Sequence, residues 1–310
     1  MSSYGRGKFQ AWVQIARLQF FPMTWIAYTM GSLACSVFSR KWDLLPYLLG
    51  YLVIFLIELS TILVNEYYDY ETDRVNQNYS PFTGGSRVLV EGKLSFREVR
   101  NVIRAILFTI PLLGYLLVKT DTGELAGSVY LLLGVGLFLG LGYTLPPLRF
   151  CYLGAGELVV GLTHSFYVIL CGYAFQGGSL LDPLPWFLGI PLFFAIIAAI
   201  VLAGLPDRLA DDGVAKKTVA VMFGPRSAIA ISMLFVVFAF LAALALVHFQ
   251  VIRLSPILWN LLVLPHGLIL LYALFRLLKS GLYDRRIDGV MVLSLTYILW
   301  FGLLPFIALR

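Results

Sequence analysis

Two short acidic stretches carry the side chains of this sequence that are best suited to chemistry. The first reads NEYYDYETD and places Asn65, Asp69 and Asp73 four residues apart. Continued as one α-helix, this spacing puts an amide and two carboxylates on a single face over roughly 12 Å of axial rise. The second reads LPDRLADD and repeats the spacing with Asp207 and Asp211. Oxygen ligands of this kind suit hard divalent cations, above all Mg²⁺ shared between carboxylates and phosphate groups.

Both acidic stretches lie at the ends of long apolar segments. Of the 310 residues, 60% are hydrophobic and 13% are charged, and the mean hydropathy is +0.86, which excludes a soluble domain with a polar surface. Segments near the ~20 residues needed to cross a bilayer recur along the chain. We therefore expect an all-α polytopic membrane protein, one domain over residues 1–310, with nine spans. The predicted spans are 18–38, 46–66, 101–118, 126–145, 156–175, 184–205, 227–249, 256–278 and 288–309.

The Lys and Arg residues are unevenly divided between the two sides of these spans. The side that holds the N-terminus and the loops after even-numbered spans receives 18 of the 23. The positive-inside rule therefore predicts a cytoplasmic N-terminus and a C-terminus on the opposite side. Both acidic stretches follow even-numbered spans, so they are expected at the cytoplasmic surface, facing each other across the bundle. The net charge of +6 is explained by loops near anionic lipid and requires no nucleic acid.

A simpler interpretation of either acidic stretch is a solvated helix end, and for one stretch alone that interpretation is favoured. A buried carboxylate, by contrast, costs ~2.5–3.5 kcal/mol on the membrane insertion scale unless a cation compensates it. Arg74 and Arg208 follow the stretches, but their one-residue offset turns them away from the acidic faces. Two facing sets of Asp with few nearby cations therefore indicate a divalent metal site that holds a phosphorylated substrate.

Other polar residues on the same side are candidates for binding phosphate. The loop SPFTGGSRVLVEGKLS contains Gly84 and Gly85, whose backbone N–H groups can approach an anion. The basic residues of the cytoplasmic loops that we single out are Arg87, Lys93, Arg149, Lys216 and Lys217. Each is equally well explained as a charge that determines topology.

One acidic residue is predicted to lie deeper in the membrane. Glu58 precedes Asn65 by seven residues and so falls on the same helical face. An ionisable residue at that depth indicates contact with a second substrate, and the alternative is a hydrogen bond between helices. The three His and three Cys are scattered singly among apolar neighbours and are expected to pack rather than to bind metal or form disulfides. In GVGLFLGLG, Gly136 and Gly140 predict close helix packing.

Three motifs in order give the sequence a resemblance to a known family. NEYYDYETD on the second span, YTLPPLRF followed by GAGE after the fourth, and DRLADDGVAKKT after the sixth resemble the UbiA superfamily of intramembrane prenyltransferases. The similarity extends over nearly the whole chain. The GGSRVLVEGKLS loop and the final span ending WFGLLPFIAL most resemble the branch that prenylates 1,4-dihydroxy-2-naphthoate on the way to menaquinone.

The resemblance implies an all-α bundle around a central cavity, with cap loops after the second and sixth spans. It implies two Mg²⁺ ions that bridge the diphosphate of a polyprenyl substrate and are held by Asn65, Asp69, Asp73, Asp207 and Asp211. Tyr143 and Arg149 would lie near the diphosphate and the reactive carbon, and Lys216 and Lys217 fall in the family's basic stretch. The implied partners are polyprenyl diphosphate, an aromatic acceptor and the lipid bilayer, with no nucleic acid and no obligate protein partner.

Three alternatives stay open on the sequence. A terpene cyclase on the same fold needs the same metal and diphosphate chemistry, and another prenyl acceptor, such as hydroxybenzoate, homogentisate or a lipid, fits the same motifs. A cation-coupled transporter is disfavoured because its ionisable groups would lie at the membrane midplane, whereas these cluster at one surface. The acceptor, the prenyl chain length and the oligomeric state are not determined by the sequence.

Overall fold

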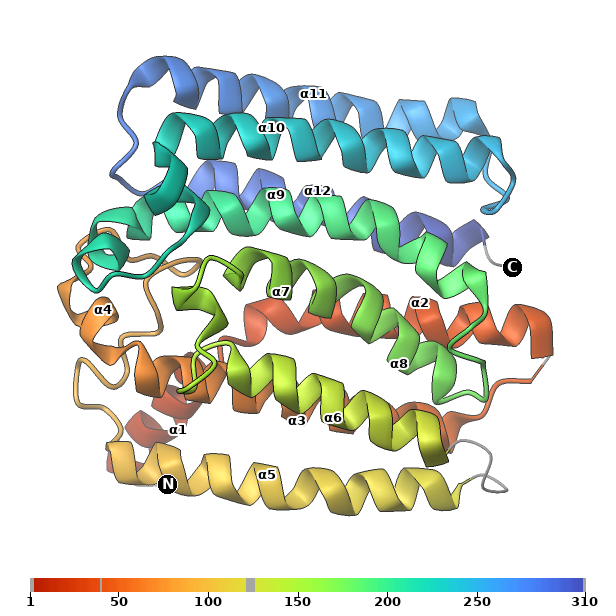
Figure 1. Ribbon diagram of the computed structural model, residues 1–310, viewed down its shortest axis with the longest axis horizontal. Coiled ribbons are helices and arrows are strands. Elements are labelled where there is room, and N and C mark those ends of the chain that lie inside the picture. The colour runs from red at the N-terminus through yellow and green to blue at the C-terminus, as the bar shows by residue number, and fades with distance from the viewer. Residues whose placement is uncertain (1–2, 40, 121–125, 309–310) are drawn as a thin grey trace.

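The computed structural model describes residues 3–39, 41–120 and 126–308, and within these ranges it contains helices and loops but no strand. The long helices run side by side as a bundle (Figure 1). In chain order the elements are α1 (Ser3–Ile15), η1 (Leu18–Phe20), α2 (Phe21–Ser39), α3 (Leu44–Tyr68), α4 (Tyr70–Val75), α5 (Phe96–Lys119), α6 (Ala126–Gly142), η2 (Phe150–Tyr152), α7 (Gly156–Leu162), η3 (Thr163–Tyr167), α8 (Val168–Ala174), α9 (Pro183–Gly213), α10 (Val219–His248), α11 (Pro256–Ser280) and α12 (Asp288–Ala308).

The helix lengths and compositions are those of an integral, multi-pass membrane protein. In the described ranges, seven helices are long and apolar enough to cross a membrane, counting α7, η3 and α8 as one, and α6 is a shorter apolar helix. Each predicted span overlaps a helix, including the first, which overlaps α2. The all-α architecture is thereby confirmed, whereas the count of nine spans stays a prediction.

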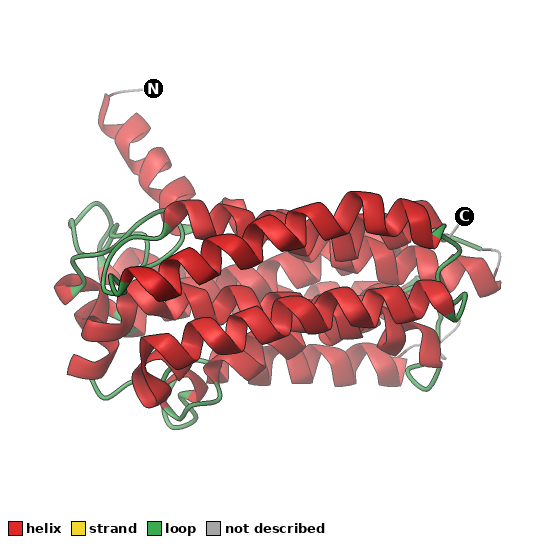
Figure 2. Cartoon of the chain, turned by 90° about the horizontal axis from the view of Figure 1, so that it is seen from above, coloured by secondary structure: helices red, strands yellow, loops and turns green. Residues whose placement is uncertain are grey.

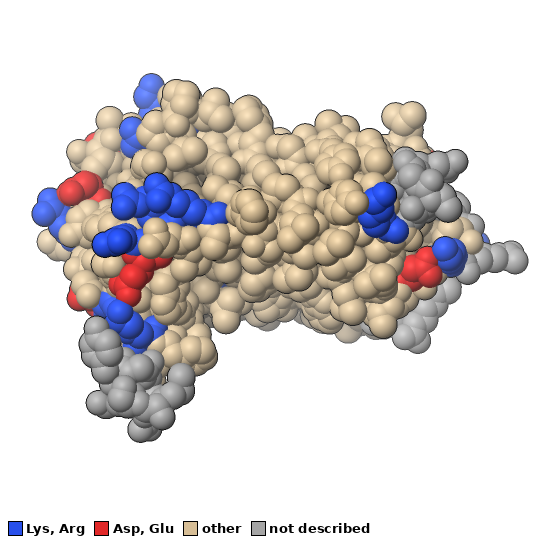
Figure 3. Space-filling view, turned by 90° about the horizontal axis from the view of Figure 1, so that it is seen from below, with Lys and Arg blue, Asp and Glu red and all other residues tan. Residues whose placement is uncertain are grey.

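The surface separates into a charged end and an apolar belt. Figure 3 shows most of the visible Lys and Arg at the end of the bundle that contains α4, and a broad belt without charge next to it. Phe108 on α5 and Leu261 on α11 are 82% and 67% exposed, as suits side chains that face lipid. Viewed from above, α1 projects from the bundle at the same charged end (Figure 2).

Glycines allow the closest helix contacts inside the bundle. A Cβ on Gly31 of α2 would overlap the carbonyl oxygen of Ile169, and one on Gly172 of α8 would overlap that of Tyr28, so α2 and α8 meet backbone to backbone. On α6, a Cβ on Gly136 would overlap the Tyr167 hydroxyl of η3, and one on Gly140 would overlap the Thr61 side chain of α3. Small residues at these positions thus hold the helices that surround the cavity at short separations.

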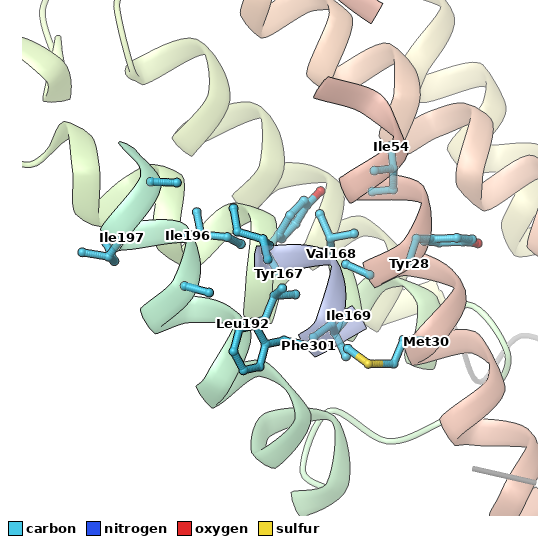
Figure 4. Close-up of a cluster of buried hydrophobic side chains, with 14 of the residues drawn as sticks. Tyr28, Met30, Ile54, Tyr167, Val168, Ile169, Leu192, Ile196, Ile197 and Phe301 are labelled. Carbon is cyan, nitrogen blue, oxygen red and sulfur yellow. The ribbon is translucent and has the colours of Figure 1, made fainter. Parts of the chain in front are cut away.

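The helix opposite α3 changes its winding halfway along. The segment from Gly156 to Ala174 is continuous, but its central turn, Thr163–Tyr167, is a π-helix between the α-helical pieces α7 and α8. A π turn contains more residues than an α turn and occurs frequently at functional sites. Figure 4 shows Tyr167 and Val168 from this region beside Ile196 of α9 and Ile54 of α3, all four of which line the cavity.

Candidate active site

The first acidic motif lies at the junction of α3 and α4. The α3 helix ends at Tyr68, and Asp69 has φ −90° and ψ 10°, so the expectation of one continuous helix through Asp73 is wrong. Asp is a weak helix former, and here its carboxylate is bonded by distant parts of the chain instead. The four-residue spacing survives, because Asp69 N–H donates to Asn65 O at 2.8 Å and Asp73 N–H donates to Asp69 O at 2.9 Å.

The second acidic motif lies on the last turns of α9. This helix continues through Pro206 to Gly213, beyond the end of the predicted span at 205, so Asp207 and Asp211 are helical. The loop after the first motif bonds the second motif directly: Asn76 Nδ2 donates to Asp207 Oδ1 at 2.7 Å, and Gly84 N–H donates to Asp207 Oδ2 at 3.2 Å. The two motifs are therefore neighbours in space although about 130 residues separate Asn76 from Asp207.

A lysine whose side chain is 13% exposed connects the two acidic motifs. Lys216 Nζ lies 2.9 Å from Asp69 Oδ2 and 3.5 Å from Asp211 Oδ1. Burial alone would lower the pKa of Lys216, but these two carboxylates raise it well above its usual value, so the side chain is an ammonium ion. The Tyr152 hydroxyl donates to Asp69 Oδ1 at 2.8 Å and completes the surroundings of that carboxylate.

The glycine-rich loop covers the remaining carboxylate of the first motif. Gly85 has φ +68°, and a Cβ there would overlap the carboxylate of Asp73. The guanidinium of Arg87 donates to the backbone oxygen of Asp73 rather than to its side chain. Burial, together with the nearby carboxylates of Glu66 and Asp69, raises the pKa of Asp73 to about 8. The free protein therefore holds a proton at Asp73 near neutral pH.

The cavity below these groups has a polar end and an apolar depth. Its volume is about 350 Å³. The acidic motifs, Lys216 and the glycine loop line the polar end, and aliphatic side chains line most of the remainder. The aliphatic lining residues include Met23, Ile54, Ile57, Val160, Val168, Ile196, Ile200, Leu295 and Ile298. Such a chamber suits an amphiphilic ligand with an anionic head and a hydrocarbon tail.

Most of the residues singled out in the sequence line this one cavity. Its wall contains Asn65, Asp69, Asp73, Asp207, Asp211, Tyr143, Lys216 and Glu58. The arginines that follow the two motifs turn away from the acidic faces, as their one-residue offset predicted. Arg74 pairs with Glu71, and Arg208 pairs with Asp284, so neither neutralises the carboxylates of the cavity.

Four of the predicted cations do not line the cavity. Lys93 Nζ lies 2.6 Å from Glu91 Oε2 and donates to Gln14 Oε1 at 3.1 Å. Arg149 has φ +45° and stacks over the Tyr152 ring at 3.6 Å, where its Nε is buried without a hydrogen bond among the described residues. The guanidinium of Arg87 lies over the Tyr79 ring at 4.5 Å. Lys217 is exposed to solvent. Arg149 is therefore one residue layer behind the wall, since it touches Tyr152, which bonds Asp69.

Several residues near the motifs were not found in the sequence. Arg17 lines the polar end, and its Nη2 donates to Phe82 O at 3.1 Å, but before the first span it resembled one more topology charge. Glu157, in the quoted GAGE stretch, accepts from Val219 N–H at 2.7 Å and so joins α7 to α10. Asn76 and Tyr152 carried no signal, because an amide in a loop and an aromatic residue in an apolar chain are both commonplace.

The donor set fits magnesium only if a ligand completes it. Carboxylate and amide oxygens from both motifs meet at one end of the cavity. The Lys216 ammonium lies between two of these carboxylates, which shows that the site stabilises positive charge. Yet within the described residues no three His, Cys, Asp or Glu side chains converge as a ready-made metal site. Mg²⁺ commonly takes one or two carboxylates together with substrate phosphates, so this arrangement fits an ion that binds with a diphosphate.

The fold and the site define a multi-pass membrane protein with an acid-lined internal cavity, and comparison with known proteins places it among characterised relatives. The UbiA prenyltransferase family matches residues 21–287. The chain belongs to the UbiA prenyltransferase family and is a membrane-embedded enzyme.

Individual relatives differ in their acceptors. The chain is 23% identical over 242 residues to a digeranylgeranylglyceryl phosphate synthase from Methanobrevibacter smithii, covering 76% of this chain and 80% of that protein. It is 24% identical over 217 residues to the 1,4-dihydroxy-2-naphthoate octaprenyltransferase of Bacillus subtilis, covering 70% and 67%. A UbiA homologue from Archaeoglobus fulgidus, solved bound to DMAPP and Mg²⁺, shares the fold with a TM-score of 0.63 at 15% identity, covering 95% of this chain and 99% of that one.

Proposed function

We propose that the protein transfers a polyprenyl group from polyprenyl diphosphate to an aromatic acceptor, 1,4-dihydroxy-2-naphthoate, in menaquinone biosynthesis. The observation that carries the proposal is the meeting of carboxylates from both acidic motifs at the polar end of one cavity whose depth is apolar. The membership of the UbiA family and the similarity to the B. subtilis enzyme support it.

In this proposal Asn65, Asp69, Asp73, Asp207 and Asp211 hold two Mg²⁺ ions with the diphosphate. The bound ions supply the positive charge that stabilises diphosphate as it leaves the allylic carbon. The A. fulgidus homologue bound to DMAPP and Mg²⁺ supports the use of Mg²⁺ with a prenyl diphosphate. Lys216 already lies between Asp69 and Asp211, so its ammonium is positioned to contact phosphate oxygens once other cations neutralise those carboxylates.

The remaining residues bind, orient and shield the reacting groups. Tyr143 lines the cavity and presents an aromatic ring near the cationic carbon. Arg149 acts on the diphosphate indirectly, because it holds Tyr152 by stacking, and Tyr152 orients Asp69. Arg87 fixes the glycine loop through the Asp73 carbonyl, and exposed Lys217 attracts the anionic substrate to the entrance. The loop keeps water from the allylic cation.

We further propose that the acidic end faces the cytoplasm. The uneven division of Lys and Arg predicts this orientation, and the same end of the molecule carries most of the charge in Figure 3. The prenyl tail then lies along the aliphatic side chains of the cavity wall and in the bilayer, where each buried CH₂ contributes about 0.8 kcal/mol.

The test is the mass spectrum of products formed by the purified protein from a labelled prenyl diphosphate, Mg²⁺ and a panel of acceptors. We expect prenylated 1,4-dihydroxy-2-naphthoate. Product from 4-hydroxybenzoate alone would overturn the choice of acceptor. A cyclic hydrocarbon made without any acceptor would identify a terpene cyclase, and no release of diphosphate under any condition would reject the enzymatic proposal.

A lipid acceptor is the second candidate. The similarity to the M. smithii synthase covers more of both chains than the similarity to the B. subtilis enzyme does. A prenylated glyceryl phosphate lipid in the same acceptor panel, with no product from either aromatic acid, would establish this second candidate instead.

A further inference from the structure

A second set of polar side chains lies in the apolar depth of the cavity. Glu58 is on α3, Thr24 is on α2, and His164 and Tyr167 are on the π turn. Seven residues separate Glu58 from Asn65 on one helix, which corresponds to roughly 10 Å of axial rise. The diphosphate chemistry proposed above, confined to the polar end, makes no use of this set.

These deep groups have hydrogen-bonding capacity that the described part of the chain does not use. Thr24 Oγ1, Glu58 Oε2 and the Tyr167 hydroxyl are buried and make no hydrogen bond of normal geometry there, although Thr24 lies near Glu58 and Tyr167 lies near Cys171. The other oxygen of Glu58 lies 3.8 Å from His164 Nε2, which is longer than a hydrogen bond. Buried polar groups are seldom left unpaired in proteins, and a carboxylate side chain only 10% exposed is an unusual exception.

The facing atoms of Glu58 and His164 are both acceptors. His164 Nδ1 lies 3.2 Å from Val160 O, and a carbonyl oxygen can only accept, so Nδ1 carries the hydrogen of this bond. In the neutral ring Nε2 is then an acceptor, and it points toward Glu58. Neither of these two atoms donates to the other, and a ligand hydroxyl beside them would donate to one of them.

The charges of the cavity wall set the orientation of such a ligand. Among the described lining residues the Lys and Arg side chains are Arg17 and Lys216, and both lie at the polar end. The pair in the depth is a carboxylate and an imidazole. The carboxylates of both acidic motifs lie at the polar end as well, and Lys216 is paired with two of them. An anionic group on the ligand is therefore favoured beside Arg17 and disfavoured beside Glu58.

We propose that Thr24, Glu58, His164 and Tyr167 form a subsite for a head group bearing hydrogen-bond donors, such as the phenolic hydroxyls of an aromatic diol. The proposal rests on the proposed function in that this ligand is the prenyl acceptor. One hydroxyl of this ligand donates to Glu58 or to His164 Nε2, and the Tyr167 and Thr24 hydroxyls complete the contacts. Any carboxylate or phosphate that the acceptor carries points back toward Arg17.

Binding of two matched probes tests the subsite without turnover. Calorimetry on the purified, metal-free protein in detergent would compare 1,4-dihydroxynaphthalene with 1,4-dimethoxynaphthalene, which has the same ring and no donor. We expect the diol to bind on the order of ten- to a hundredfold more tightly, the scale of one hydrogen bond to a charged group. Equal affinity of the two probes, or no measurable binding of the diol, would overturn the proposal.

Variants assign the preference to the named residues. Glu58→Leu should abolish the preference for the diol and leave the affinity for the dimethoxy compound unchanged, and Glu58→Gln, which keeps one acceptor oxygen, should fall between. If Glu58→Leu does not fold, Glu58→Gln and His164→Phe carry the test. Ser60→Ala is the matched control, because Ser60 is a buried polar residue of the same helix whose hydroxyl already donates to Ile57 O at 2.8 Å. A preference that persists in both Glu58 variants would contradict the assignment.

The same variants separate this proposal from the proposed function. In turnover assays, loss of the subsite should raise KM for the acceptor at least tenfold and leave KM for the prenyl diphosphate unchanged. If the protein prefers the diol but forms no prenylated product, the subsite proposal stands and the proposed function is rejected. If wild type and Glu58→Leu form product with equal KM for the acceptor, the proposed function stands and the subsite proposal is rejected.

Discussion

The two ends of the cavity satisfy their polar groups in different ways. At the polar end Asp207 accepts from Asn76 and Gly84, and Asp69 is bonded by Tyr152 and Lys216. In the depth, Glu58 has an oxygen without a partner in the described chain. The carboxylates of the polar end are therefore satisfied by hydrogen bonds within the protein, which bound ligands would replace. In the depth, a carboxylate oxygen has no such hydrogen bond from the described residues. The polar end is suited to reversible binding of ions, and the depth is suited to a head group with hydrogen-bond donors.

The largest effect is expected from removing a carboxylate at the polar end. Asp69→Ala or Asp207→Ala should lower the rate of diphosphate release by at least a hundredfold, because a preorganised electrostatic contact to the leaving group is lost. Release of labelled diphosphate measures this, and elution as a monodisperse peak in detergent shows that the variants fold. Asp288→Asn, which removes a carboxylate paired with Arg286 away from the cavity, is the control. Near-normal rates in either Ala variant would remove the basis for a paired metal site.

Loss of the lysine that connects the motifs should destabilise the metal-free protein. Lys216→Met leaves the buried carboxylates of Asp69 and Asp211 without their cation, which typically costs about 3–5 kcal/mol. Thermal unfolding in EDTA measures the effect, and added Mg²⁺ with diphosphate should restore part of it. The neighbouring exposed residue gives a matched control, Lys217→Met, for which we expect almost no change in Tm. Similar Tm values for both variants would show that the polar end is not held by Lys216.

The pH dependence of the polar end follows from the raised pKa of Asp73, about 8. The folded protein retains a proton that the unfolded chain releases near pH 4, so this contribution to stability is complete below pH 4 and is lost as the pH rises toward 8. In EDTA, Tm should fall from pH 5 to pH 8, and Asp73→Asn should flatten the profile. For the same reason Mg²⁺ affinity should increase with pH, by at most tenfold per unit for one displaced proton. A wild-type profile identical to that of Asp73→Asn would contradict the assignment.

The smallest effect is expected for the arginine outside the cavity. Arg208 forms a partly exposed pair with Asp284 at 2.8 Å, so Arg208→Ala should cost less than about 1 kcal/mol and leave diphosphate release within twofold. Guanidinium-induced loss of activity and the initial rate measure the two quantities. A large loss of activity would show that Arg208 does reach the substrate and would contradict its placement outside the cavity.

Local spacing in the sequence predicted the polar end more completely than the depth. The four-residue repeats of Asn65, Asp69 and Asp73 survive in the structure because the hydrogen-bond spacing persists, even though the helix is interrupted at Asp69. The apolar segments predicted the all-α bundle because span length and composition are local properties. The position of Glu58 on the face of Asn65 followed from the same periodicity.

What the sequence did not predict depends on contacts between distant segments. Arg17 reaches the polar end through Phe82, and Asn76 reaches Asp207 across the bundle. Arg149 was expected at the diphosphate, yet it stacks behind Tyr152, because a left-handed backbone at that residue directs the side chain there. His164 was expected to be a packing residue, and only the pairing of two helices places it beside Glu58.

The π turn at Thr163–Tyr167 determines how the two halves of this helix are oriented relative to each other. Glu157 and Val160 ahead of the turn line the cavity, as does His164 within it, and beyond the turn Ile169 and Gly172 meet α2 backbone to backbone. If the same residues were wound as a regular α-helix, the extra residue would rotate one half by about 100° relative to the other. Either the wall or the contact with α2 would then be misaligned, so the wider turn lets one helix serve both surfaces.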